Sequence, residues 1–181
     1  MKLYVSRHTR TNYNDLGLCN SDPAIDVHLT ELGLQQAEDL AKKLHGAEFE
    51  RIIVSKLSRT TETAKIINKY HNVPIEQDNR LTDNATGFEG KSAAEYYAAV
   101  MAAPDPWAYK ATDSYGGESL NEVMARVTAF LGDLSKRTEN SILVVSHMSV
   151  IQIIVGLLEG LGKDEMLKVE VPHGEYRTFD I

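Results

Sequence analysis

Short apolar runs that end in polar loops recur along the chain. Residues 51–54 (RIIV) and 141–145 (SILVV) are rich in β-branched side chains, a composition typical of strands buried on both faces of a sheet. Near the amino end, Leu3 and Val5 alternate with more polar neighbours until Arg7 interrupts the apolar run. Each run therefore predicts a strand with polar side chains at its carboxyl end, the place where ligands collect in such sheets.

Amphipathic stretches between these runs predict helices. Thr30 is a typical N-cap for the first, whose apolar stripe includes Leu34 and Ala37, and Gly46 is its expected stop. A Ser-x-x-Glu capping box at Ser119 opens a later one. Five helices are predicted. They span 31–45, the residues from the cap Ser58 to Asn68, 92–103, the residues from the cap Ser119 to Leu134, and 150–159.

Three other segments have less regular patterns. Residues 167–171 and 176–181 predict two short closing strands. Residues 105–117 show no period, and we interpret them as a lid-like loop, with aromatic packing over one end of the core as the alternative. The aromatic residues of this loop are Trp107, Tyr109 and Tyr115.

Composition and charge limit the class of protein. The 181 residues suffice for one domain, 1–181, with a substantial core. No apolar run approaches the length of a membrane span, and the amino end lacks a secretory signal pattern. Cys19 is the only cysteine, so no internal disulfide is possible and the reducing cytoplasm is the favoured location. We interpret Cys19 itself as a spare loop thiol. A net charge of −7 argues against a nucleic-acid binder, so an anionic substrate would need a local positive pocket.

Candidate chemistry gathers where the predicted strands end. Arg7 and His8 follow the first strand, Arg59 lies just past the second, and His147 follows the run 141–145. A neutral imidazole nitrogen can attack phosphorus while guanidinium forks hold the phosphoryl oxygens. An Arg-His pair alone is also compatible with a solvated strand end. Together with Asp83 in a loop, however, these groups outline a phosphate pocket.

With these groups and their neighbouring motifs in this order along the sequence, the chain resembles the histidine phosphatase superfamily, whose fold is phosphoglycerate mutase-like. The resemblance spans nearly the whole sequence and rests on five motifs that are weak singly and strong in register. The matching pieces are Arg7-His8-Thr9-Arg10-Thr11-x-x-Asn14; Leu29-Thr30 with Gly33 and Gln36-Ala37; Ser55, Leu57, Arg59, Thr63 and Ala64; Gly116-Gly117-Glu118-Ser119; and Ser146-His147.

The resemblance implies an α/β fold, a three-layer α/β/α sandwich around a mostly parallel central sheet. It also implies a phosphomonoesterase of the short broad-specificity branch, a histidine acid-type phosphatase that hydrolyses a small phosphorylated metabolite through a phosphohistidine on His8. Asp83, two residues after Leu81, stands in the place of the proton donor, with Glu118 and Glu89 as competing candidates. The implied catalytic residues are His8, Arg7, Arg59, Asp83 and His147, and the implied substrate-binding residues are Thr11, Asn14, Arg10 and Met148.

Two rival functions stay open at this point. One is a phosphoglycerate-type mutase, and the other is a catalytically silent phosphate-binding module. The second follows from Thr9 and Met148, which stand where the family has glycine and would reshape the pocket if glycine served a close approach or a positive φ. No metal or cofactor is expected, because the other histidines, His28, His45, His71 and His173, are too scattered to predict a metal site. The leaving alcohol and the oligomeric state are left open.

Overall fold

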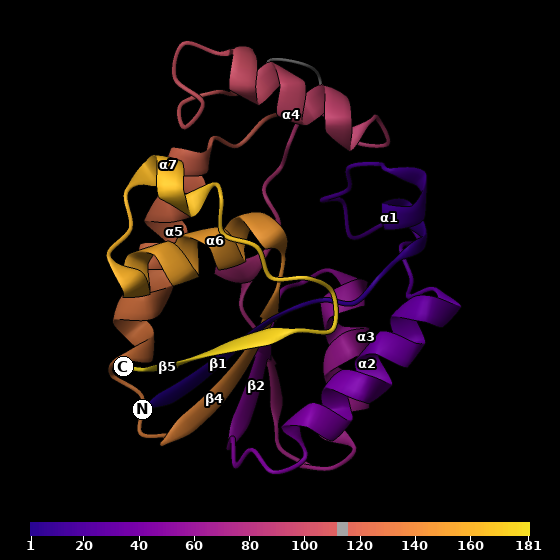
Figure 1. Cartoon of the computed structure of the whole chain (residues 1–181), viewed down its shortest axis with the longest axis vertical. Coiled ribbons are helices and arrows are strands. Elements are labelled where there is room, and N and C mark those ends of the chain that lie inside the picture. The colour runs from indigo at the N-terminus through magenta and orange to yellow at the C-terminus, as the bar shows by residue number, and fades with distance from the viewer. Residues whose placement is uncertain (112–115) are drawn as a thin grey trace.

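Five strands form one sheet in the order β3-β2-β4-β1-β5 (Figure 1). The computed structural model describes residues 1–111 and 116–181. Neighbouring strands are parallel except for β5, which runs antiparallel to β1. The mostly parallel sheet predicted from the family resemblance is thus confirmed. The strands are β1 (Lys2–Arg7), β2 (Arg51–Val54), β3 (Ile75–Gln77), β4 (Ser141–Ser146) and β5 (Tyr176–Asp180).

Helices cover both faces of this sheet, as expected for a three-layer sandwich (Figure 1). Because successive side chains of a strand point to opposite faces, β1 contributes to two hydrophobic layers. Leu3 and Val5 pack with α5 and α6, whereas Tyr4 packs with α2 and α3. The helices are α1 (Asn12–Leu16), α2 (Glu31–Leu44), α3 (Ser58–Asn68), α4 (Ala93–Ala102), α5 (Leu120–Leu134), α6 (Met148–Glu159) and α7 (Lys163–Met166), with a 3₁₀ turn at Asn79–Leu81.

The first long helix, α2, begins as predicted and faces the core differently. The hydroxyl of Thr30 accepts a hydrogen bond from the N–H of Gly33, which confirms the cap. Leu34 was predicted in the buried stripe, but it is 47% exposed and Leu40 is buried in its place. The reason lies at Gly33, where a Cβ would come within 1.9 Å of the carbonyl oxygen of Arg10. This close approach turns Gly33 inward and the next residue outward.

The caps of the other helices are partly as predicted. Ser119 and Glu122 form the expected capping box at α5, and Ser92 caps α4. Ser58 does not cap α3. Its hydroxyl donates to the backbone carbonyl of Val27, and the N-cap position is occupied by Leu57 without a side-chain bond. Ser58 therefore links α3 to a distant loop instead of to its own backbone.

Two predictions near the ends of the chain need correction. Residues 167–171 form a turn and coil instead of a strand. Val169 and Val171 are buried in the layer that contains α5 and α6, so the strand-like pattern reflects packing without pairing. The short helix α1 was not predicted, because the polar residues after the first strand suggest a loop and a five-residue helix is too short to show a period.

One aromatic ring of the predicted lid-like loop is buried in the core. Trp107 is 3% exposed and belongs to the layer around α5, which supports the packing alternative for this ring. Tyr109 packs against a small cluster that contains Cys19, the predicted spare loop thiol, which is free and buried. Tyr115 lies outside the described residues. None of the helices within the described ranges is both long enough and apolar enough to cross a bilayer.

Candidate active site

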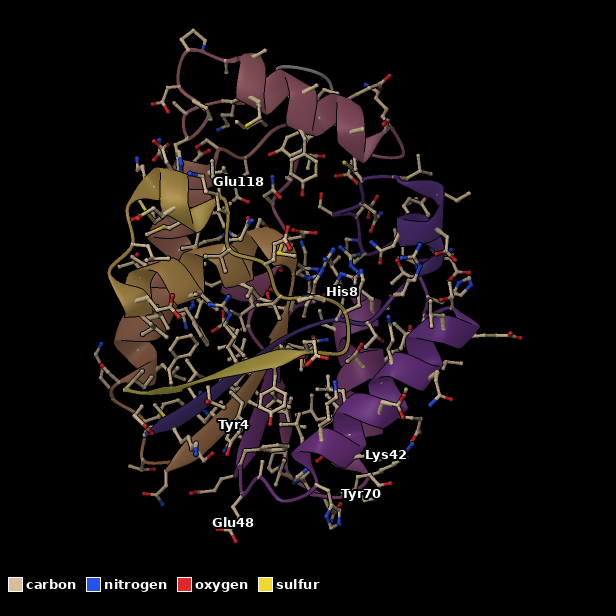
Figure 2. The ribbon with its side chains drawn as sticks, viewed as in Figure 1. Tyr4, His8, Lys42, Glu48, Tyr70 and Glu118 are labelled. Carbon is tan, nitrogen blue, oxygen red and sulfur yellow. The ribbon has the colours of Figure 1, made fainter. Side chains whose placement is uncertain are left out.

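Pairing between β1 and β4 brings the two predicted histidines together. Arg7 lies opposite Ser146 in the parallel register, and the N–H of His8 donates to the carbonyl oxygen of Ser146 at 2.9 Å. The rings of His8 and His147 consequently lie 5.2 Å apart, centroid to centroid. Figure 2 shows His8 at the carboxyl end of β1, on the side of the sheet towards α4.

The tautomer of His8 is set by the backbone carbonyl of the next residue, Thr9. Nδ1 lies 2.8 Å from the carbonyl oxygen of Thr9, and a carbonyl only accepts, so Nδ1 carries the proton. Burial, followed by the nearby positive charge of Arg59, holds the pKa of His8 well below its ordinary value. The ring is therefore neutral at pH 7 and carries its lone pair on Nε2, the form that a nucleophile needs.

Two buried guanidinium groups provide the local positive charge. Arg59 is 5% exposed, and its terminal nitrogen donates to the carbonyl oxygen of Asn20 at 2.9 Å and to Asp83 at 3.3 Å. Arg7 lacks any acceptor for its buried Nε among the described residues. A buried donor without a partner costs about 1–3 kcal/mol, which an anionic ligand would recover. Burial lowers the pKa of both arginines, yet such groups stay charged at pH 7.

His147 is held at the site by Ser55. The serine Oγ lies 2.8 Å from Nε2 of this ring, which is fully buried. Burial and the charge of Arg59 keep the pKa of His147 well below its ordinary value, so its 3.6 Å approach to Asp83 is a contact of a neutral ring. If the hydroxyl donates to Nε2, the hydrogen is on Nδ1, an atom with no hydrogen-bond partner among the described residues. Nδ1–H can then donate to a phosphoryl oxygen.

Of the three candidate proton donors, Asp83 lies at the cluster of arginines and histidines. One of its oxygens accepts from the Ser149 hydroxyl at 2.9 Å, and the other faces Arg59. Glu118 binds the guanidinium of Arg126 with both oxygens, at 2.7 and 2.9 Å, and Figure 2 shows it apart from His8. Glu89 accepts from the backbone and the hydroxyl of Ser21. Both glutamates thus have structural partners.

A cavity of about 170 Å³ opens at this end of the sheet. Among the predicted residues it is lined by Arg7, Thr11, Asn14, Arg59, Asp83 and Met148. His8 follows Arg7 directly, and His147 precedes Met148. Thr11 and Asn14 hold each other through the capping box of α1. Arg10 does not line the cavity, because its half-exposed guanidinium pairs with Asp15.

The two residues at the family's glycine positions fit without backbone strain. Among described residues other than glycine, only Asn72 has a positive φ, so Thr9 and Met148 adopt ordinary conformations. The N–H of Thr9 donates to the hydroxyl of Thr63, and Met148 begins α6. Met148 therefore lines the cavity without distorting the chain, whereas Thr9 is buried against Thr63 and does not line it.

Sequence reasoning missed a third histidine at the site. Nδ1 of His173 donates to the carbonyl oxygen of His8 at 2.7 Å, and the two rings lie 5.4 Å apart. Burial is the main cause that lowers the pKa of His173 to about 4. No sequence signal distinguished this residue, since the antiparallel return of β5 alone brings it to β1.

Three residues that support the predicted groups were also missed: Asn20 on Arg59, Ser55 on His147, and Ser149 on Asp83.

Comparison with known protein families identifies the family of this chain. The model of the histidine phosphatase superfamily (branch 1) matches residues 3–181. The chain belongs to the histidine phosphatase superfamily. The resemblance noted in its motifs is thereby confirmed over almost the entire sequence.

Individual members of the superfamily resemble the chain over most of their length. It is 28% identical to the adenosylcobalamin/alpha-ribazole phosphatase of Escherichia coli, with 100% of this chain and 90% of that protein covered. It is 30% identical to phosphoserine phosphatase 1 of Hydrogenobacter thermophilus, with 81% and 71% covered. The crystal structure of the alpha-ribazole phosphatase from Shigella flexneri superposes with a TM-score of 0.86 at 25% identity, covering 100% of this chain and 91% of that one.

A metal-binding cluster is not found in the part of the chain that the structure describes. No group of three or more His, Cys, Asp or Glu side chains there has the geometry to hold an ion. The cations that line the cavity, within the described residues, are Arg7 and Arg59.

We expect the neutral histidines to make stability depend on pH. A histidine whose pKa is lower in the folded than in the unfolded state binds fewer protons when folded, so its contribution is complete above about pH 6.5 and is lost as pH falls. The unfolding free energy should fall by about 1.4 kcal/mol per pH unit for each such histidine between pH 6 and 5.

Urea titrations at pH 7, 6 and 5 measure this slope. His8→Asn and His147→Asn should each lower the slope of the unfolding free energy against pH by about 1.4 kcal/mol per pH unit relative to the unmodified protein, because each removes one proton from the number taken up on unfolding. Parallel curves for the variants and the parent would mean that these rings are protonated in the folded state.

Proposed function

We propose that this protein is a phosphomonoesterase that hydrolyses a small phosphorylated metabolite through a phosphohistidine on His8. The observation that carries the proposal is the bond from Nδ1–H of His8 to the carbonyl of Thr9, which leaves the Nε2 lone pair beside Arg7 and Arg59. A guanidinium fork matches two phosphoryl oxygens at once, and buried charges are screened little by water. The pair therefore suits a phosphate monoester dianion.

The proposed reaction has two steps. In the first, Nε2 of His8 attacks phosphorus as the P–O bond to the alcohol breaks, and Asp83 gives its proton to the departing oxygen. In the second, Asp83 takes a proton from water, whose oxygen attacks phosphorus and releases His8 and inorganic phosphate. Arg7, Arg59 and Nδ1–H of His147 stabilise the charge that spreads over the equatorial oxygens in both steps.

Release of phosphate from a panel of monoesters tests this function. We expect turnover of p-nitrophenyl phosphate and of at least one phosphorylated metabolite, and no transfer of the phosphoryl group to a second position of the substrate. A silent module would bind phosphate analogues and release nothing. The ordinary backbone of Thr9 and Met148 removes the strain argument for such a module.

The relatives and the composition support the wider setting of the proposal. The similar proteins named above are phosphatases of phosphorylated small molecules. We propose a cytoplasmic location on the basis of the single cysteine, and no nucleic-acid partner on the basis of the net charge of −7. The finer assignment to the histidine acid type stays a prediction, since the matching family model is that of branch 1.

Asp83→Asn should give a defect that depends on the leaving group. A general acid matters most when the departing oxygen is strongly basic, so we expect a loss of about 10²-fold in kcat on an alkyl phosphate and far less on p-nitrophenyl phosphate. Steady-state rates on the two substrates measure the contrast. Glu89→Gln should affect both alike, because Glu89 binds Ser21. A selective defect in Glu118→Gln, with none in Asp83→Asn, would transfer the role to Glu118.

A further inference from the structure

A second, largely apolar cavity adjoins the one that contains the two arginines. It measures about 100 Å³ and lies between α4 and the start of α6. The two cavities share four lining residues, Asn84, Tyr96, Tyr97 and Ser149, so they lie side by side. Its other lining residues are Val100, Met101, Leu120, Gln152 and Leu167. None of these residues carries a charge, in contrast to the neighbouring cavity.

The charges of the first cavity are all at its phosphoryl end. Its cationic lining residues, within the described chain, are Arg7 and Arg59, and its only acid is Asp83. All three belong to the cluster that would hold and cleave the phosphoryl group. A carboxylate on the alcohol part of a substrate would therefore meet no cation beyond that end.

Most of the polar side chains that line the second cavity already have hydrogen-bond partners, whereas the hydroxyl of Tyr97 has none among the described residues. The amide of Asn84 donates to the Tyr96 hydroxyl at 2.7 Å, and the amide of Gln152 donates to the carbonyl oxygens of Leu167 and Val169, each at 3.1 Å. Ser149 donates to Asp83. The Tyr97 hydroxyl is thus left to bind one polar group of a ligand, and the rest of the recognition here comes from apolar contact.

Two apolar side chains of α4 stand exposed at this cavity. Tyr97 is 58% exposed and Met101 is 67% exposed, and both line it one helical turn apart. Burying such side chains against an apolar ligand is favourable in proportion to the area removed from water.

We propose that the second cavity receives the alcohol part of the substrate, and that this part is bulky, uncharged and built around an apolar ring. The proposal rests on the proposed phosphatase function and names the substrate class for the same site. It excludes short alkyl monoesters that carry a carboxylate. Met101 and Tyr97 would set this specificity, with Tyr97 facing both the phosphoryl end and the ring.

Binding of phosphonates, which have a C–P bond and are not hydrolysed, tests the cavity apart from the chemistry. Calorimetry should show 2-naphthylmethylphosphonate binding at least about 10-fold tighter than ethylphosphonate, and 3-phosphonopropionate no tighter than ethylphosphonate. Met101→Lys and Tyr97→Ala should each reduce the first ratio about fivefold or more. Leu32→Lys is the matched control, because Leu32 is a 54% exposed apolar residue on α2, outside both cavities.

Turnover separates failure of this inference from failure of the function. The corresponding pair of substrates is 2-naphthyl phosphate and phenyl phosphate, for which kcat/KM should favour naphthyl. Hydrolysis of both without preference, together with equal phosphonate affinities, would overturn the cavity assignment and leave the phosphatase intact. A clear phosphonate preference without hydrolysis of any monoester would support the cavity and overturn the phosphatase. Tightest binding of 3-phosphonopropionate would contradict the substrate class.

Discussion

Replacing His8 by asparagine is expected to lower kcat on every phosphate monoester by about 10⁴-fold or more. Asparagine can keep a donor near the Thr9 carbonyl but has no lone pair comparable to that of Nε2. The covalent intermediate is then lost, and only binding by Arg7 and Arg59 is left. Steady-state rates with p-nitrophenyl phosphate measure the loss, and His45→Asn, at an exposed position, is the control.

Trapping the intermediate identifies the nucleophile directly. Brief incubation with a substrate labelled in its phosphoryl group, followed by a quench in base, should leave acid-labile label on the peptide that contains His8. The label should be absent from His8→Asn. Label found only on serine, threonine or aspartate would refute the mechanism.

Arg59→Lys is expected to cost about 10²-fold or more in kcat, although the charge is kept. Arg59 is buried, and its terminal nitrogens bond to both the side chain and the backbone of Asn20 while one also reaches Asp83. Lysine has a single ammonium on a flexible stem, so it cannot hold this direction and offer a planar fork to two phosphoryl oxygens. KM should change less than kcat, because the fork matches the transition state best.

Arg51→Lys is the matched control for this substitution. Arg51 is also a partly buried arginine in ion pairs, with Glu76 and Glu139, but it lies at the amino end of β2, away from the site. It should keep near-normal turnover. Equal kcat values for Arg59→Lys and the parent would mean that the phosphoryl group lies elsewhere.

The parts predicted well from sequence are those in which local pattern and position in the fold agree. The runs 51–54 and 141–145 are buried strands, and the placement of Arg7, His8 and His147 follows because parallel strands end at the same edge. The helix caps at Thr30 and Ser119 could be predicted because each cap bond joins residues within four positions of one another. These features need no knowledge of distant contacts.

The errors arise where a distant part of the chain decides. The outward turn of Leu34 follows from the approach of Arg10's backbone to Gly33. His173 reaches His8 only because β5 returns antiparallel beside β1. In each case the deciding contact joins segments whose proximity no periodicity encodes.

The position of β1 between β4 and β5 has a consequence for how the protein is made. Lys2 pairs with Ser141 on one side and with Asp180 on the other, so the strand that leads to His8 stays unpaired until β4 has been synthesised. Contacts so distant in sequence slow folding, and an apolar strand left open is prone to aggregate. A nascent chain that stops before β4 can fold α2 and α3 against little more than β2 and β3, and it has no place to hold His8. The residue proposed as the nucleophile is therefore synthesised well before the strands that hold it in place.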